Sequence, residues 1–206
     1  MKFQKVLFSA LCTLVLSSSA FAFTQEESSL VNESYRLEAS KDYVQAISKM
    51  TKVLGENKSD YFVNFRLGWL YNLVKKYDKT TEYYEQAAKS APESLEPWLA
   101  LSILNLNLGS NEKLLNVTEE ILKRAPTNYY GLQRGATACI KLKKFELGLT
   151  KVNKALEMYP TDTIFLEQKG YILKQMNKSS EAKKVLEFLL LLSPENAYAK
   201  SVLAGK

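Results

Sequence analysis

Proline recurs in this chain at one fixed interval. Four of its 5 prolines are separated by 34 residues each time: Pro92, Pro126, Pro160 and Pro194. Each follows a stretch rich in residues that favour helix. Proline ends a helix because it has no amide hydrogen and clashes with the preceding turn. The interval therefore predicts a helical unit of 34 residues that is repeated along the chain.

Small and apolar residues keep the same interval. One column contains only small residues: Gly68, Ser102, Ala136 and Gly170. Two apolar columns begin at Val53 and Leu54. A small residue in the first helix of a unit lets the second helix approach closely, and apolar columns fill the seam to the next unit. The sequence therefore predicts an all-α fold of stacked helix pairs.

The pattern resembles the tetratricopeptide repeat family, and the best match lies in one segment. That segment holds, in the order and spacing of the family, Leu67, Gly68, Tyr71, Tyr77, Tyr84, Ala87 and Pro92. In the first repeat, Glu33 and Ser34 depart from the family's Leu-Gly pair. The resemblance implies a right-handed superhelical α-solenoid of about five antiparallel helix pairs. The repeats are expected at about 27–60, 61–94, 95–128, 129–162 and 163–196, with a short capping helix in 197–206.

The first 22 residues have the features of a secretory signal peptide. Lys2 and Lys5 precede the apolar run 6–16, and residues 20–22 have the small-x-small pattern of a cleavage site. An uncleaved anchor is the alternative, although the run is short for a bilayer span. We expect an exported protein, in the periplasm or alternatively secreted or in a secretory lumen, whose residues 23–206 form a single domain.

The chain lacks the side chains on which many catalytic and metal sites depend. It contains no histidine, and removal of residues 1–22 would leave one cysteine, Cys139. A lone cysteine on an apolar helix face is usually a small buried hydrophobic residue. The carboxylates are scattered, and the formal net charge of +6 is spread over many helices. We therefore expect no enzyme, no cofactor, no metal site and no nucleic-acid partner.

The resemblance implies that ligand-facing residues lie on the first helix of each repeat, two places to a helix. These places hold Val31, Tyr35, Phe65, Trp69, Leu99, Ile103, Gln133, Thr137, Glu167 and Tyr171. In the first three repeats they are apolar or aromatic, which predicts a strip for apolar side chains of a partner. The candidate binding residues are Tyr35, Phe65, Trp69, Leu99, Ile103 and Tyr171. The alternative is that Phe65 and Leu99 belong to the core.

Some members of the family hold an acidic C-terminal tail with a clamp of Lys, Arg and Asn. Val31, Tyr35 and Trp69 stand where such polar residues are needed, so that specificity is not expected. Asn64 and Asn72 are nearby.

Five consecutive apolar residues, 188–192, form a second notable patch. They cover more than one face of a helix. One interpretation is packing against the capping residues Tyr198, Val202 and Leu203. The other is a homodimer or a partner contact.

Taken together, these features predict a protein that binds another polypeptide. The leading hypothesis is a scaffold or assembly factor of the cell envelope. The alternative is a periplasmic holding chaperone for apolar segments of unfolded clients. A third hypothesis is an accessory subunit of an enzyme.

Overall fold

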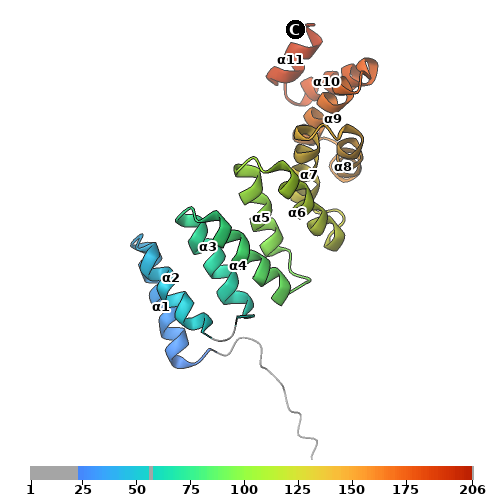
Figure 1. Cartoon of the computed structure of the whole chain (residues 1–206). Coiled ribbons are helices and arrows are strands. Elements are labelled where there is room, and N and C mark those ends of the chain that lie inside the picture. The colour runs from blue at the N-terminus through green and yellow to red at the C-terminus, as the bar shows by residue number, and fades with distance from the viewer. Residues whose placement is uncertain (1–22, 56–57, 206) are drawn as a thin grey trace, which may run out of the picture.

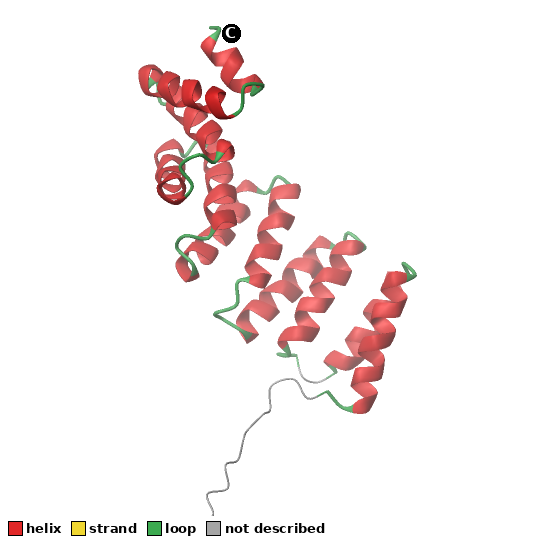
Figure 2. Ribbon diagram, turned by 180° about the vertical axis from the view of Figure 1, so that it is seen from behind, coloured by secondary structure: helices red, strands yellow, loops and turns green. Residues whose placement is uncertain are grey.

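The computed structural model describes residues 23–55 and 58–205. All regular secondary structure within these ranges is α-helical, and no strand is found there (Figure 2). The predicted signal peptide, residues 1–22, lies outside the described residues. In the part of the chain that is described, no helix is long and apolar enough to cross a membrane.

Eleven helices follow one another through the described ranges. They are α1 (Gln25–Ala39), α2 (Tyr43–Leu54), α3 (Tyr61–Leu73), α4 (Tyr77–Ser90), α5 (Glu96–Asn107), α6 (Asn111–Arg124), α7 (Tyr129–Lys141), α8 (Phe145–Met158), α9 (Thr163–Gln175), α10 (Ser179–Leu192) and α11 (Ala197–Leu203). The first ten pack as five consecutive pairs, α1 with α2 through α9 with α10, and α11 closes the stack. The pairs form an elongated arc from α1 to α11 (Figure 1).

The helix boundaries repeat with the period of the sequence. Four of the odd-numbered helices begin after an Asp or Asn whose side chain accepts a hydrogen bond from a backbone N–H of the first turn: Asp60, Asn128, Asp162 and Asn196. The turn inside each pair contains a residue with φ between 58° and 65°: Lys41, Lys75, Gly109, Lys143 and Asn177.

The column of small residues lies where the two helices of each pair are closest. A Cβ built on Gly68 would lie 2.6 Å from the ring of Tyr84, and one on Gly170 would lie 2.4 Å from Leu186. Ser34 belongs to the same column, since its side chain is fully buried and its hydroxyl donates to the carbonyl of Ala46 at 3.1 Å. Although the first repeat lacks the family's Leu-Gly pair, Ser34 is a small residue at the helix crossing.

The core continues from pair to pair and ends beneath α11. Leu186 and Leu189 of α10 are fully buried, and Tyr198, Val202 and Leu203 of α11 pack against them. The predicted capping helix is therefore present. The predicted fold class, an all-α solenoid of five helix pairs with a C-terminal cap, is confirmed.

Candidate functional site: a cleft between α3 and α5

The first helices of successive pairs form one row along the solenoid. In this row α5 lies against α7, α7 against α9, and α9 against α11. The backbones of α1 and α3, and those of α3 and α5, approach each other less closely than these pairs. The row is therefore looser at its first two junctions, the second of which lies between α3 and α5.

A cleft of about 390 Å³ opens at this junction. Its walls come from α3, α4 and α5, and it is lined by Phe65, Trp69, Asn72, Tyr84, Leu99, Ala100, Ile103, Leu104 and Asn107. Seven of these nine side chains are apolar or aromatic, and the two asparagines lie near the C-terminal ends of α3 and α5. Ligand pockets in proteins commonly combine such an apolar lining with a few polar groups.

Four of the predicted binding residues meet in this α3–α5 cleft. Trp69 and Ile103 are 43% and 47% exposed, whereas Phe65 and Leu99 are half-buried. The ring of Phe65 packs on that of Tyr84 with 5.3 Å between centroids. Phe65 thus contacts the core with one side of its ring and lines the cleft with the other. The core role and the binding role predicted for it are therefore compatible.

Trp69 is held in place from the side away from α5. Its Nε1 donates a hydrogen bond of 2.7 Å to Oε1 of Glu38 in α1. The same carboxylate forms an ion pair with Arg66, whose side chain is 8% exposed. A tryptophan whose polar edge is already bonded offers its ring to a partner at little further cost in conformational entropy.

The cleft depends on one position of the repeat. Three of the four first helices from α3 to α9 have a long polar side chain there, namely Arg66, Arg134 and Gln168, and each reaches back to the preceding first helix. Arg66 pairs with Glu38, Arg134 donates to Ser102 Oγ at 2.6 Å, and Gln168 donates to Thr137 Oγ1 at 3.0 Å.

In α5 the same position holds Ala100, which lines the cleft. A methyl group cannot bridge to α3. The seam that the other repeats fill with a polar side chain is therefore left open here, between Trp69 and Ile103. Positions 66, 100, 134 and 168 are 34 residues apart, so the short side chain at position 100 could have been noticed in the sequence. The predicted binding strip did not take this column into account.

Two predicted binding residues lie outside the cleft. Tyr35 is 47% exposed, but the guanidinium of Arg66 covers one face of its ring, with Cζ 3.8 Å from the centroid. Tyr171 lies in α9 and packs against Tyr198 of the cap, with 5.8 Å between the ring centroids. Neither lines the cleft, so the candidate residues do not form one continuous strip.

Other places named from the resemblance have structural roles. Val31 is buried in the core at 9% exposure, so its assignment as ligand-facing was wrong. Thr137 Oγ1 and the main-chain carbonyl of Gln133 accept hydrogen bonds from Gln168, and the Glu167 carboxylate accepts one from Asn196. Asn64 is buried and donates to the carbonyls of residues 58 and 60, which leaves Asn72 as the asparagine near the cleft.

Arg134 lies beside the cleft, because its side chain reaches the backbone of Leu99, one of the lining residues. Its hydrogen bonds go to two neutral groups of α5, Ser102 Oγ and the carbonyl of Leu99, and its Cζ lies 4.7 Å from the ring centroid of Tyr130. Burial lowers the pKa of this guanidinium from its ordinary value, because its charge has lost part of its hydration. A carboxylate placed beside it would compensate for that loss.

Burial holds two titratable side chains, Tyr84 of the cleft and Cys139 of the core, in their neutral forms. Burial raises the pKa of Tyr84 to about 12, so its phenol stays protonated at neutral pH. Cys139 is fully buried in a seam of the core, and burial raises the pKa of its thiol, which disfavours the nucleophilic thiolate. The absence of catalysis remains a prediction from the sequence.

Stacked helix pairs around an open cleft define a helical-repeat protein of the kind that presents a binding surface. The family model described as tetratricopeptide repeat matches residues 63–94 and 165–196. The crystal structure of YrrB, described as a TPR protein with an unusual peptide-binding site, has a TM-score of 0.71 at 13% identity, covering 85% of this chain and 90% of that one. Residues 63–94 and 165–196 are therefore tetratricopeptide repeats, and the described chain has the fold of a tetratricopeptide-repeat solenoid.

Further similarities agree with this assignment. MamA from Desulfovibrio magneticus RS-1 has a TM-score of 0.69 at 15% identity, covering 85% of this chain and 99% of that one. Among curated proteins, the BBSome complex member BBS4 from Bos taurus is 28% identical over 111 residues, which are 54% of this chain and 21% of that protein. The chain thus spans about a fifth of the length of this relative.

Proposed function

We propose that this protein is a scaffold that binds a short segment of another polypeptide in the α3–α5 cleft. The observation that carries the proposal is the apolar cleft between Trp69 and Ile103, which is open where the neighbouring seams are filled. Its fold supports the proposal, since stacked helix pairs expose a long surface suited to peptides. The peptide-binding site described for the structurally similar YrrB supports it as well.

The lining favours a segment with one or two bulky apolar side chains. A cleft of about 390 Å³ is large enough for such an anchor, and Phe65, Leu99 and Leu104 would surround it. The carboxamides of Asn72 and Asn107 can each donate to and accept from the backbone of the bound segment. Aromatic and aliphatic anchors seated in a pocket supply most of the binding energy at many interfaces.

Replacing Trp69 with alanine should weaken peptide binding about thirtyfold, or about 2 kcal/mol, because it removes one wall of the cleft. The probe is the strongest binder from a random peptide library, labelled with a fluorophore and titrated by fluorescence anisotropy. Tyr35→Ala is the matched control, since Tyr35 occupies the same position one repeat earlier and lies outside the cleft. Unchanged binding by Trp69→Ala, with an intact helical spectrum, would exclude this cleft as the site.

A carboxylate next to the apolar anchor should strengthen binding through Arg134. In the Arg134→Gln variant, affinity for an acidic form of the probe should fall about fivefold, the size expected for a partly exposed ion pair. Affinity for the same probe with the acid changed to its amide should stay the same. Glutamine is the appropriate replacement because Gln168 holds this position in the next repeat. Equal losses for both probes would contradict a role in charge recognition.

The volume of the α3–α5 cleft, about 390 Å³, suits one short segment and therefore favours a scaffold over a holding chaperone. A scaffold that seats one segment should bind its probe with a stoichiometry of one and should not prevent unrelated proteins from aggregating. A holding chaperone should suppress the aggregation of heat-denatured citrate synthase or insulin B chain. Suppression that is lost in Trp69→Ala would favour the chaperone function instead.

We also propose that the protein is exported and acts in the cell envelope, most plainly in the periplasm. The support is the sequence of residues 1–22, with its basic start, short apolar run and small-x-small end. N-terminal sequencing of the protein recovered from a periplasmic fraction should begin at residue 23. Recovery in the cytoplasm with Met1 intact would contradict export, while leaving the proposal for the cleft untouched.

A further inference from the structure

The apolar run 188–192 in α10 divides into two parts. Leu189 and Leu190 pack into the core beneath the capping helix. Phe188, Leu191 and Leu192 point the other way and are 40%, 78% and 40% exposed. The packing expected against the cap accounts only for the first part. Since positions 188, 191 and 192 lie on one side of a helix, the exposed residues form a continuous apolar face, called here the α10 face.

The equivalent positions in the other second helices carry mostly polar or charged residues. In α4 they are Gln86, Lys89 and Ser90, and in α6 they are Glu120, Lys123 and Arg124. In α8 they are Lys154, Glu157 and Met158. The repeat architecture therefore does not require apolar residues here, and it tolerates lysine at the first two of the three positions. The α10 face is a property of this unit alone among α4, α6, α8 and α10.

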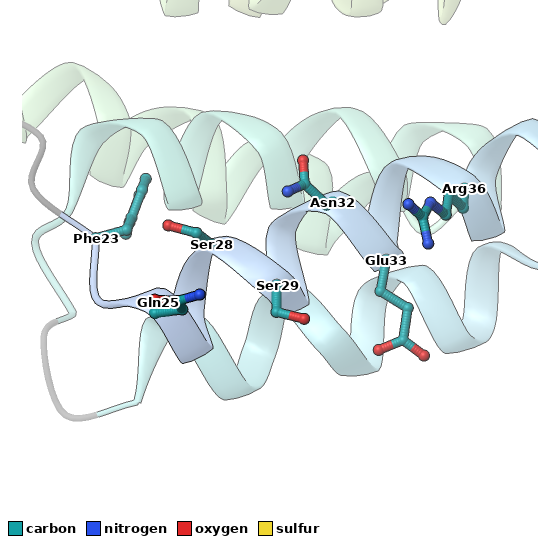
Figure 3. A pocket seen from close by; sticks show the side chains of 7 residues that line it. All are labelled: Phe23, Gln25, Ser28, Ser29, Asn32, Glu33 and Arg36. Atoms are coloured by element: carbon teal, nitrogen blue, oxygen red, sulfur yellow. The ribbon is translucent and has the colours of Figure 1, made fainter.

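The outward face of α1, at the N-terminal end of the described solenoid, is an example of a surface that no other helix covers. The outward side chains of α1 beside Phe23 are polar: Gln25, Ser28, Ser29, Asn32, Glu33 and Arg36 (Figure 3). Terminal units of repeat proteins need such polar outer faces to remain soluble. The α10 face lacks this property, although its helix belongs to the last pair of the stack, next to α11 (Figure 1). An apolar face in this place indicates a surface that another protein covers.

We propose that the α10 face binds the same face of a second copy of this chain, with the two α10 helices antiparallel about a two-fold axis. In a two-fold interface each patch meets its own copy, so the charges around it must be self-complementary. Placing Phe188 opposite Leu191 of the second copy sets the register. The same register places Lys184, one turn before Phe188, opposite Glu195, which follows the end of α10.

The charges at this rim are exposed to solvent. Lys184 and Glu195 are both exposed, the side chain of Glu195 to 91%. The partner of Glu195 within the chain is Lys200, at 2.7 Å and itself 49% exposed. Two Lys184–Glu195 contacts related by the axis would flank an apolar centre. An apolar centre with a charged rim is the usual composition of a protein interface.

The first test measures the oligomeric state of the purified protein by sedimentation velocity over a range of concentrations. The wild type should form a dimer in reversible equilibrium with a monomer. Leu191→Lys should weaken the dimer more than about a hundredfold, because it buries two unpaired charges at the centre. Lysine is already present at the equivalent position in α4 and α6, so the variant should keep its helical spectrum and its thermal midpoint. A wild-type protein that is monomeric at every concentration would overturn the proposal.

The second test fixes the register by charge reversal. Lys184→Glu and Glu195→Lys should each weaken the dimer about tenfold, since each places like charges opposite one another at two related contacts. The double variant should regain most of the wild-type affinity, because every contact is again between opposite charges. A double variant that is as weak as either single variant would refute the antiparallel register. Both variants leave the α3–α5 cleft unchanged, so peptide binding serves as an independent measure that the fold is intact.

Discussion

Replacing Gly68 with alanine should lower the free energy of unfolding by about 2 kcal/mol. The added Cβ would lie 2.6 Å from Cδ1 and 2.8 Å from Cε1 of Tyr84, a ring that is 3% exposed and cannot move into solvent. Overpacking a core in this way costs about 3 kcal/mol, and the better helix propensity of alanine recovers about 1 kcal/mol. Thermal denaturation followed by circular dichroism should show a midpoint lower by about 6 °C.

The physical basis is a balance of sizes between the two helices of each pair. Gly68 faces Tyr84, and Gly170 faces Leu186. Where the first helix has Ala136, the residue at the equivalent position of the second helix is the smaller Val152, in the same core cluster. Substituting both residues, Gly68→Ala with Tyr84→Val, reproduces this pair. The double variant should be about 2 kcal/mol more stable than the sum of the single changes predicts.

A second glycine provides the control for the first. A Cβ on Gly135, in the middle of α7, would lie 3.0 Å from Cδ of Lys151 and 3.1 Å from Oγ1 of Thr118, contacts that a shift of a few tenths of an ångström relieves. Gly135→Ala should therefore change stability by less than about 1 kcal/mol. Equal losses of unfolding free energy for Gly68→Ala and Gly135→Ala would mean that contact with Tyr84 does not explain the effect at Gly68.

Replacing Ala100 with arginine should abolish binding of the peptide probe, with a loss of more than about a hundredfold. The new side chain would occupy the α3–α5 cleft itself. Arg66, one repeat earlier, is the natural precedent, since its Cζ lies 3.8 Å from the ring centroid of Tyr35. Because Trp69 occupies the position of Tyr35 in the next repeat, an arginine at position 100 can lie over the indole in the same way. Fluorescence anisotropy with the labelled probe measures the loss.

The matched control introduces the same residue at the same position of another repeat. Gln168→Arg changes the seam between α7 and α9, which is already filled by Gln168. It should leave probe affinity within about twofold of the wild type. Both variants should retain the helical spectrum, since arginine occurs naturally at this position in α3 and α7. Full binding by Ala100→Arg would show that the probe is held elsewhere on the protein.

Much of the fold could be predicted from the sequence, because the same pattern of residues occurs in several repeats. The 34-residue interval of the prolines and small residues determined the helix pairs and the close crossing at Gly68. The resemblance to the tetratricopeptide repeat also placed Phe65, Trp69, Leu99 and Ile103 on the face where they are found. These properties depend on contacts within one unit or on the direction of a side chain from its own helix, and local sequence sets both.

The tertiary structure decided which of these residues form a site. Tyr35 is covered by Arg66, Tyr171 packs on the cap, and Val31 lies in the core, although all three occupy positions equivalent to residues of the cleft. Whether a seam is open depends on the length of one side chain from the next unit, which is Ala100 in α5. That outcome is a property of two neighbouring helices and their spacing, so the pattern of either helix alone could not determine it.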